Sequence, residues 1–198
     1  MKEQKKSLKN LNIDKNWTLF LDRDGVINKK IENDYVRNWS QFNFIPNVID
    51  ALKILRKIFG KIIIFTNQRG IGRGLMSEKD LYQIHENMLN IFKENSIYID
   101  KIYYCPHDYE KENCECRKPQ IGLILKAKED FPDIDFKKSI IVGDSLLDME
   151  LGEKVKMVTV YISIEKFYER KELIDFKFKS LFDFAKFLKI KINCYYKN

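Results

Sequence analysis

Apolar residues follow two patterns along this chain. Five short runs are almost continuously apolar, as strands buried on both faces of a sheet are, and they lie at about 17–21, 61–65, 101–104, 139–143 and 157–162. Between these runs apolar residues recur at helical spacing, for example at positions 48, 49, 52, 54 and 55 in a stretch that begins at Pro46 and ends at Gly60. The alternation of strands and helices predicts an α/β fold in which a parallel sheet has helices on both faces.

Three further helices are predicted. Two of them are indicated by residues that favour helix ends, and the third by a last apolar stretch. Ser77 is expected to be the N-cap of a helix that runs to about residue 95. Pro119 suits the first turn of the next helix, which is expected to end at about residue 130. A last helix is expected at about 181–190, where its apolar face would cover one side of the sheet, and residues 28–45 are expected to form a loop or extended arm.

The length of 198 residues suits a single domain with a hydrophobic core. We expect this domain to span residues 17–190, preceded by a polar segment at 1–16 that is frayed or loosely docked and followed by a tail at 191–198. No apolar run is as long as a membrane helix, and the polar N-terminus lacks the apolar core of a signal peptide. These features predict a cytoplasmic protein without a membrane partner, and none of them indicates an oligomeric state.

The formal net charge of +7 raises the question of a nucleic-acid partner. The lysines are scattered among Glu and Asp rather than gathered in a stripe, which favours a solvated lysine-rich surface over a nucleic-acid face. Arginine is used sparingly, and most arginines fall in the motif stretches described below, where a planar group that binds phosphate would be needed: Arg23, Arg69, Arg73 and Arg117.

Polar side chains follow three of the predicted strands directly. Asp22 and Asp24 come after the first strand, Thr66 after the second and Asp144 after the fourth. Ligands of open α/β sheets bind beyond the carboxyl ends of the strands, so we expect these side chains at one edge of the sheet. A pair of carboxylates suits phosphate chemistry, because one can bind Mg²⁺ and attack phosphorus while the other exchanges a proton with the leaving group.

A cationic pair, Arg117 and Lys118, precedes the helix expected from Pro119, where free backbone N–H groups also favour anions. Two acids on one strand, a hydroxyl on the next, a lysine and a distant acid are together the groups that phosphoryl transfer needs. The ordered set therefore predicts an enzyme that transfers phosphoryl groups, although each member alone is a weak signal.

Three of the four cysteines and one histidine have the spacing Cys105-x-His107-x6-Cys114-x-Cys116. Three thiolates and one imidazole complete the tetrahedral coordination of Zn²⁺ and leave no open position, so such a site would be structural. The alternative is a group of reduced thiols in a loop. A zinc site would pin a loop that has little core of its own, and would hold Arg117 and Lys118 beside the phosphate.

Taken in order, these motifs resemble those of the haloacid-dehalogenase (HAD) phosphatase superfamily, and within it the zinc-bearing heptose bisphosphate and histidinol phosphate phosphatases. The resemblance spans about residues 17–162, and it is carried by residues 20–28 (FLDRDGVIN), 65–74 (FTNQRGIGRG), 103–107 (YYCPH), 114–119 (CECRKP) and 142–145 (VGDS). It implies a three-layer Rossmann-like fold with a zinc-binding loop at 105–116 and, because the gaps between the motifs are short, without a cap domain.

The resemblance implies roles for the residues at the strand ends. Asp22 would be the nucleophile that forms an aspartyl-phosphate, and Asp24 the acid that protonates the leaving alkoxide and then activates water. Thr66 would hydrogen-bond the transferring phosphoryl group, and Lys118 would balance its charge. Mg²⁺ would be held by the Asp22 carboxylate, the Asp24 backbone carbonyl and Asp144.

The substrate implied by the resemblance is a small phosphorylated metabolite. The sugar enzymes, which share more features with this chain, remove the 7-phosphate of D-glycero-D-manno-heptose 1,7-bisphosphate, whereas the six-residue gap between His107 and Cys114 is similar to that of the histidinol phosphate enzymes. Ser145, in place of a lysine, and Asp34, in place of a glycine, also depart from the heptose pattern. Heptose bisphosphate is the first expectation and histidinol phosphate the alternative; the expected substrate contacts are Asp34, Tyr35, Asn67, Arg73 and Arg117.

Two functions of other classes stay open. A nucleic-acid 3′-end phosphatase would use the same chemistry, and predicts binding to single strands that depends strongly on salt. A zinc-bearing binding module without activity is disfavoured by the intact set of catalytic groups. Of the remaining residues, Asp148 would, by the same resemblance, steady Lys118. His85, within a predicted helix, is expected to be a surface or helix-packing residue rather than a base.

Overall fold

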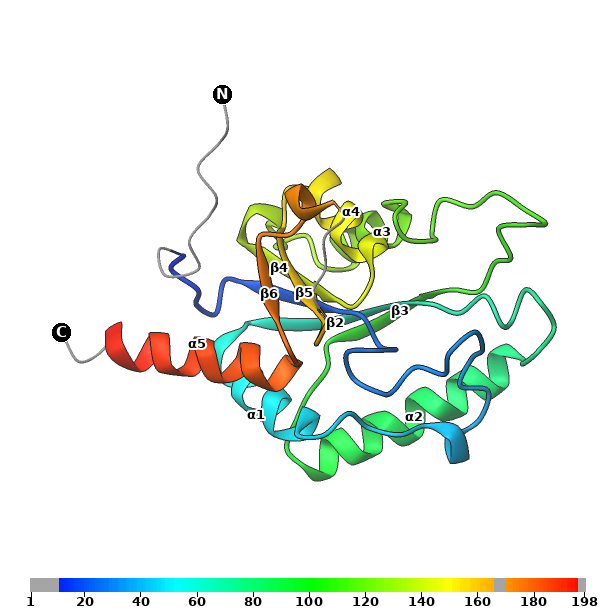
Figure 1. Cartoon of the computed structure of the whole chain (residues 1–198), viewed down its shortest axis with the longest axis horizontal. Coiled ribbons are helices and arrows are strands. Elements are labelled where there is room, and N and C mark those ends of the chain that lie inside the picture. The colour runs from blue at the N-terminus through cyan, green and yellow to red at the C-terminus, as the bar shows by residue number, and fades with distance from the viewer. Residues whose placement is uncertain (1–10, 166–169, 196–198) are drawn as a thin grey trace.

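Six strands form one parallel sheet in the computed structural model, which describes residues 11–165 and 170–195 (Figure 1). The strand order is β3-β2-β1-β4-β5-β6. The strands are β1 (Thr18–Leu21), β2 (Lys61–Asn67), β3 (Lys101–Cys105), β4 (Ser139–Gly143), β5 (Val158–Ile162) and β6 (Phe176–Phe178). The predicted α/β fold with a parallel sheet is therefore confirmed.

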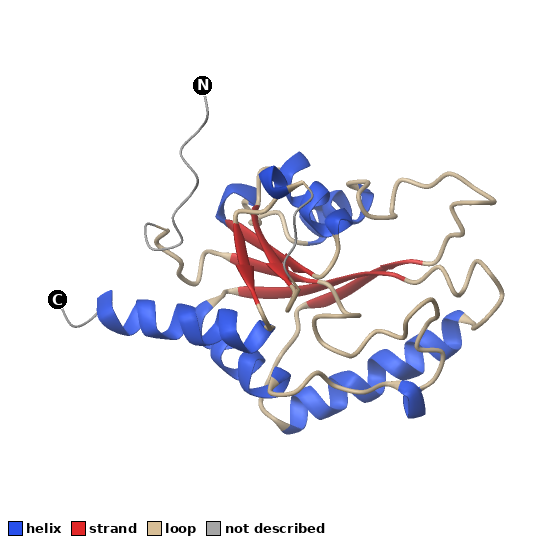
Figure 2. Cartoon of the chain, viewed as in Figure 1, coloured by secondary structure: helices blue, strands red, loops and turns tan. Residues whose placement is uncertain are grey.

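Helices cover both faces of this sheet. They are α1 (Val48–Ile58), α2 (Glu78–Glu94), α3 (Gly122–Asp130), α4 (Leu146–Lys154) and α5 (Leu181–Tyr195). Figure 2 shows α3 and α4 on one face and α1, α2 and α5 on the other. No helix within the described ranges is both long enough and apolar enough to cross a membrane.

β1 lies at the centre of the sheet, and all of its residues are buried. It pairs with β2 on one side and with β4 on the other, so that Leu21 stands opposite Ile64 and Val142. The chain changes direction across the sheet at β1, because β2 and β3 lie to one side of it and β4, β5 and β6 to the other. A crevice opens at the carboxyl edge of such a switch point. The fold thus places the residues that follow β1, β2 and β4 around one hollow.

Successive side chains of the central strand enter two separate hydrophobic clusters. Leu19 and Leu21 belong to the cluster that α1, α2 and α5 cover, whereas Phe20 belongs to the cluster beneath α3 and α4. All three side chains are fully buried. Because each such burial contributes about 1.5–3 kcal/mol, the motif that follows β1 starts from one of the most firmly held positions in the fold.

The boundaries of α2 agree with the sequence prediction. Ser77 caps the helix, since its hydroxyl accepts from the backbone N–H of Asp80 at 3.2 Å, and the Asp80 carboxylate accepts from the backbone N–H of Ser77 at 2.8 Å. This reciprocal capping box satisfies two N–H groups that the helix leaves free. Residues 28–45, also as expected, form a loop that contains only the 3₁₀ turn Trp39–Gln41.

α3 begins at Gly122, three residues later than the predicted start at Pro119. The segment before it turns back on itself, because the Gln120 N–H donates to the Arg117 carbonyl at 2.7 Å and the Gly122 N–H donates to the Glu115 carbonyl at 2.8 Å. The expectation that Arg117 and Lys118 lie at a helix start is therefore wrong. They lie in the turn that joins the Cys/His loop to α3.

One α-helix and one strand of the described residues were not predicted. α4 lacks a single apolar stripe, because Leu147 is exposed on the helix while Met149 and Leu151 are buried, and its period is therefore obscured. β6 is a three-residue edge strand in which exposed Lys177 separates two half-buried phenylalanines, so it is too short for an alternating pattern to be recognised.

The ends of the chain are more ordered than expected where the structure describes them. Residues 1–10 and 196–198 lie outside the described residues. Residues 11–16 pack on the domain, since Ile13 is buried and Lys15 Nζ donates to the carbonyls of Arg56 and Phe59 at 2.8 and 3.2 Å. α5 continues past its predicted end near residue 190 to Tyr195, because residues 191–195 contain neither Gly nor Pro to stop it.

Gly152 lets α4 lie directly on β4 and β5. A Cβ atom at this position would come within 2.5 Å of Ile141 Cγ2 and 2.7 Å of Thr159 Cγ2. Alanine favours helices by about 1 kcal/mol over glycine, but overpacking of a core costs about 1–3 kcal/mol. We therefore expect Gly152→Ala to lower the free energy of unfolding by urea, whereas Glu153→Ala, at an exposed position of the same helix, should change it little. A more stable Gly152→Ala protein would show that this contact is not close.

Candidate active site

A pocket of about 230 Å³ lies at the carboxyl ends of β1, β2 and β4. Most of the residues that line it were expected from the sequence: Asp22, Asp24, Asp34, Tyr35, Asn67, Arg117, Lys118 and Asp144. The lining is completed by Lys30, Ile31, Val36, Ser145 and Leu147. No motif had marked Lys30 or Leu147, which approach the pocket only through the path of the loop after β1 and through α4.

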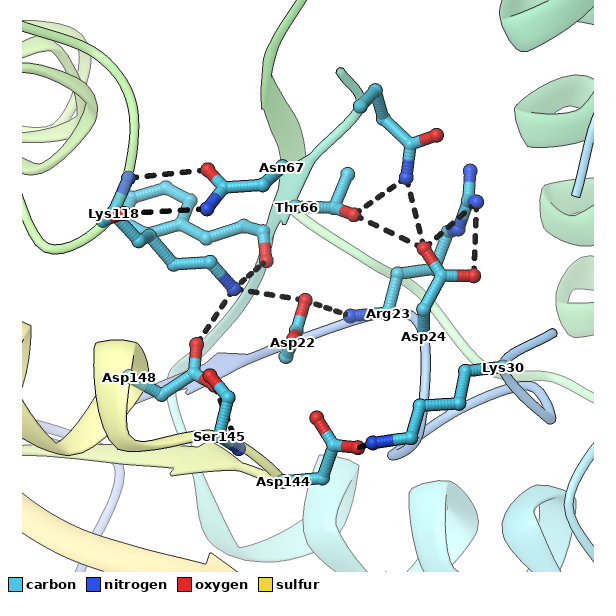
Figure 3. A network of polar contacts seen from close by, with 12 residues as sticks. Asp22, Arg23, Asp24, Lys30, Thr66, Asn67, Lys118, Asp144, Ser145 and Asp148 are labelled. Atoms are coloured by element: carbon cyan, nitrogen blue, oxygen red, sulfur yellow. Dashed lines mark hydrogen bonds and ion pairs between the residues drawn. The ribbon is translucent and has the colours of Figure 1, made fainter. Parts of the chain in front are cut away.

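Lys118 lies between two carboxylates (Figure 3). Its Nζ is 2.9 Å from Asp22 Oδ1 and 2.6 Å from Asp148 Oδ1, and it donates to the Phe65 carbonyl at 3.1 Å. Burial alone would lower the pKa of this amine, but the charges of Asp148 and Asp22 raise it above its ordinary value. Lys118 therefore stays positively charged while 3 % exposed, and Asp148 steadies it.

Asp22 directly follows β1 and belongs to a group of three acids. Oxygens of Asp22, Asp144 and Asp148 all lie within 4.8 Å of one another. Burial raises the pKa of the Asp22 carboxyl above its ordinary value; Lys118 opposes this rise, and the charges of Asp148 and Asp144 add to it. The three acids thus carry more negative charge than Lys118 alone neutralises.

Asp144 follows β4 and faces the backbone of the motif after β1. A Cβ atom on Gly25 would lie 2.1 Å from Asp144 Oδ2, so the missing side chain makes room for this carboxylate. Lys30 Nζ pairs with the same oxygen at 2.6 Å. Mg²⁺ prefers oxygen ligands and binds through one or two carboxylates. The donor set fits such an ion, because Asp22, Asp144 and the backbone carbonyl of Asp24 can hold it.

Asp24 is held by its neighbours in a carboxylate form. Arg23 Nη2 donates to both of its oxygens at 3.0 and 2.9 Å, Asn28 Nδ2 donates to Oδ1 at 2.8 Å, and Gln68 Nε2 donates to Oδ2 at 2.9 Å. Burial alone would raise the pKa of Asp24, but the Arg23 charge and the hydrogen bonds from Asn28, Arg23 and Gln68 hold it below its ordinary value. Gln68 and Asn28 lie within the motif stretches 65–74 and 20–28, but the sequence assigned neither of them a role.

Arg23 and His85 form a buried pair beside Asp24. Arg23 is fully buried, and its Nη1 lies 3.1 Å from His85 Nε2. Burial, followed by the charge of Arg23, lowers the pKa of His85 to about 3, so the neutral ring accepts a hydrogen bond from the guanidinium. His85 packs in the interior rather than at the surface, and it also supports the arginine that holds Asp24.

Three further residues expected in the site differ in how they face the pocket. Thr66 is 1 % exposed and does not line it; its hydroxyl lies 3.4 Å from Asp24 Oδ2 and accepts from Gln68 Nε2 at 2.7 Å. Asn67 lines the pocket and also accepts from the Lys118 backbone N–H at 3.1 Å. Arg73 is exposed and lies outside the lining.

The four residues of the Cys/His motif come together at the end of β3. His107 Nδ1 is 3.0 Å from Cys116 Sγ and 3.6 Å from Cys105 Sγ, and Cys105 Sγ is 3.6 Å from Cys114 Sγ. One ligand atom from each residue lies within 4.8 Å of the others, and the three cysteines are free thiols. Three sulfur atoms and an imidazole nitrogen suit a soft or borderline cation. The cluster can therefore hold a metal ion.

Comparisons with known proteins agree with this geometry. A family model described as polynucleotide kinase 3 phosphatase matches residues 17–191. The D-glycero-alpha-D-manno-heptose-1,7-bisphosphate 7-phosphatase of Mycobacterium bovis is 46% identical over 139 residues, which cover 70% of this chain and 73% of that protein. The enzyme of the same name from Campylobacter jejuni is 42% identical over 178 residues, which cover 89% of this chain and 98% of that protein.

Solved structures show the same fold. The crystal structure of the D,D-heptose 1,7-bisphosphate phosphatase from B. bronchiseptica, complexed with magnesium and phosphate, superposes with a TM-score of 0.77 at 24% identity, and the match covers 88% of this chain and 99% of that one. Fold, strand-end motifs and relatives point to one family. The chain belongs to the HAD phosphatases, in the family of the D,D-heptose 1,7-bisphosphate 7-phosphatases, and is a phosphoric monoester hydrolase.

Proposed function

We propose that this phosphatase removes the 7-phosphate of D-glycero-D-manno-heptose 1,7-bisphosphate. The observation that carries the proposal is the arrangement of charge in one pocket lining, where Lys118 holds Asp22 and Arg117 presents a guanidinium without a carboxylate partner among the described residues. A sugar bisphosphate has two anionic groups, of which one can react at Asp22 while the other pairs with Arg117. The names of the relatives from Mycobacterium bovis and Campylobacter jejuni support the same substrate.

Asp22 is the proposed nucleophile. One of its carboxylate oxygens attacks phosphorus and the bond from phosphorus to the sugar oxygen breaks. The departing alkoxide takes its proton from the acid form of Asp24, which is the minor form because Arg23, Asn28 and Gln68 favour the carboxylate. Asp24, now a carboxylate, takes a proton from water, whose oxygen attacks the aspartyl-phosphate and releases inorganic phosphate. Arg23, Asn28 and Gln68 favour the carboxylate form that this second step needs. Lys118 balances the charge on the phosphoryl group in both steps.

We propose that Asp22, Asp144 and the Asp24 carbonyl hold Mg²⁺, which when bound shields the repulsion between an anionic nucleophile and an anionic substrate. Lys30 supplies a positive charge at Asp144, and its side chain is 62% exposed, so it can turn toward solvent. Burial raises the pKa of both Asp22 and Asp144, and the neighbouring acid Asp148 adds to the rise in each case. A divalent cation among these three acids would offset that cost.

Zinc is the proposed occupant of the Cys/His cluster, in a structural role. Four protein ligands complete a tetrahedral site and leave no position for substrate. The cluster ties Cys105, at the end of β3, to Cys116, which immediately precedes Arg117 and Lys118. A bound ion would therefore hold these two cations in place without entering the reaction.

The remaining contacts follow from position in the pocket. Asp34, Tyr35 and Asn67 are proposed to contact the sugar, because all three line the pocket. Arg73 lies outside the pocket lining and is proposed to contact parts of the substrate that extend beyond the pocket. Thr66 is proposed to hydrogen-bond the phosphoryl group. Its hydroxyl would then donate to a phosphate oxygen instead of to the Asp24 carboxylate. Cytoplasmic location and the absence of a nucleic-acid partner stay predictions from the sequence.

Substrate preference is the direct test of the proposal. With Mg²⁺ and a zinc-replete protein, we expect kcat/KM for the heptose 1,7-bisphosphate to exceed that for L-histidinol phosphate by about tenfold to a hundredfold, because the second phosphate adds a charge-assisted contact. A 3′-phosphorylated oligonucleotide serves as the third substrate, since the matching family model is named for polynucleotide phosphatases. Preference for either alternative would overturn the substrate while leaving the chemistry intact.

Replacement of the nucleophile separates chemistry from folding. We expect Asp22→Asn to lower kcat by a factor on the order of 10⁴ or more, and to yield no phosphorylated protein from labelled substrate. The melting temperature should change little, because the amide oxygen still accepts a hydrogen bond from Lys118, Asp148 still balances the charge of that lysine, and one charge leaves a group of three acids. Asp50→Asn, at an exposed position in the first turn of α1, is the matched control. Undiminished turnover by Asp22→Asn would refute the assignment.

Metal removal tests the Cys/His cluster. One zinc ion per chain is expected by elemental analysis, and Co²⁺ in its place should show thiolate charge-transfer absorption that Cys114→Ser weakens. After chelation, amide hydrogen exchange should rise in the loop at 105–118, and restored Mg²⁺ alone should not recover activity. A chelated protein with full activity and unchanged exchange in this loop would contradict a structural metal.

A further inference from the structure

Arg117 differs from the other charged groups near the pocket in having no polar partner. No hydrogen bond or ion pair of its guanidinium occurs among the described residues, and its Nη1 atom is buried without a hydrogen-bond partner. By contrast, the ammonium group of its neighbour Lys118 has three polar partners, namely two carboxylates and a backbone carbonyl. A buried, unpaired N–H is costly unless a ligand satisfies it, so this guanidinium is suited to an anion that arrives with the substrate.

The ring of Tyr109 makes a cation–π contact with Arg117. Arg117 Cζ lies 4.6 Å from the centre of this ring, which is within the range of a cation–π contact. Tyr109 belongs to the loop between His107 and Cys114, and its side chain is half exposed. The ring face thus contacts the guanidinium without accepting a conventional hydrogen bond from it, and Nη1 keeps its donor capacity.

Tyr109 is itself held by a second arginine. Arg69 Cζ lies 3.9 Å from the same ring centre. Arg69 is 8 % exposed and pairs with Asp108 at 2.5 Å and with Glu110 at 2.6 Å. The two acids flank Tyr109 in the sequence, so the arginine clamps this part of the loop. Arg69 is paired with two carboxylates, whereas Arg117 has no carboxylate partner among the described residues.

Tyr109 and Arg117 lie beside the pocket in which the substrate is proposed to bind, so their contact can affect substrate binding as well as folding. A second pocket of about 400 Å³, lined by Tyr109, adjoins the pocket that contains Asp22. Both linings include Arg117, Lys118 and Leu147. Arg117 therefore lies between the pocket that contains Asp22 and the second pocket, which Tyr109 lines.

We propose that Tyr109, clamped by Arg69, is a positioning residue that holds the Arg117 guanidinium toward the second, non-reacting phosphate of a bisphosphate substrate. The inference rests on the proposed function, because it needs a substrate with two anionic groups. A preorganised arginine loses less side-chain freedom when it binds an anion than a mobile one does. Tyr109 thereby contributes to substrate specificity without touching the reacting atoms.

The test compares two substrates that differ only in the second phosphate, the heptose 1,7-bisphosphate and the heptose 7-phosphate. For Tyr109→Leu we expect KM for the bisphosphate to rise about threefold to thirtyfold with little change in kcat, while KM for the monophosphate stays the same. Tyr109→Phe keeps the ring and should behave as the unmodified protein. Tyr82→Leu, at an exposed tyrosine of α2, is the matched control.

A double-mutant cycle shows whether Tyr109 acts through Arg117. Arg117→Gln should lower the preference for the bisphosphate, and Tyr109→Leu should then cause no further loss. Zinc content and melting temperature are measured for every variant, because Tyr109 lies two residues from His107. Equal losses for both substrates in a zinc-replete Tyr109→Leu protein, or additive effects in the cycle, would overturn the inference.

The outcomes also separate this inference from the proposed function. If the unmodified protein hydrolyses both substrates equally well, the second phosphate is not recognised, and the proposed bisphosphate substrate fails with the inference. If the unmodified protein prefers the bisphosphate and Tyr109→Leu keeps that preference, the function stands and the role of Tyr109 is refuted.

Discussion

The buried charge of Lys118 is the constraint on which the site depends. Its ammonium group contacts Asp22 after β1, the carbonyl of Phe65 in β2 and Asp148 on α4, so one cation ties together three elements of the domain. An ammonium in the interior is tolerable only when its hydrogens are all matched, and loss of one partner of a buried pair costs about 3–5 kcal/mol. The same requirement that keeps Lys118 in place keeps the nucleophile candidate oriented. Stability of the fold and geometry of the site are therefore coupled at this residue.

Two carboxylates of the same short motif have opposite surroundings. Burial raises the pKa of Asp22, Lys118 opposes the rise, and the neighbouring acids Asp148 and Asp144 add to it. Asp24 receives hydrogen bonds from Arg23, Asn28 and Gln68, and its pKa is lowered. The difference arises from which neighbours the fold supplies, since the two residues are only two positions apart. An arrangement of this kind assigns distinct tasks to two chemically identical groups.

The loop that carries the cations has little apolar core of its own, and its order comes from other interactions. The Cys/His cluster gathers its two ends, and Arg69 clamps its middle through Asp108 and Glu110. Gly72 allows the neighbouring loop to approach closely, because a Cβ atom there would lie 2.5 Å from the Asp108 nitrogen. Polar and metal-ligating groups thus hold this loop in one conformation, whereas hydrophobic burial holds the strands of the sheet in place.

The sequence by itself determined the architecture and the chemical groups of this protein. Continuous apolar runs marked five of the strands, since burial on both faces leaves no alternation, and Asp22, Asp24, Asp144 and the Cys/His motif could be read from residue type and spacing. It could not reveal α4 or β6, whose patterns are irregular or too short. Only the tertiary structure decided that Lys30 pairs with Asp144, that Thr66 faces Asp24, and that Arg117 contacts Tyr109 with no counter-ion in the described part of the chain. The physical reason is that backbone periodicity is a local property, whereas the partners of a charge depend on which distant segments the sheet brings together.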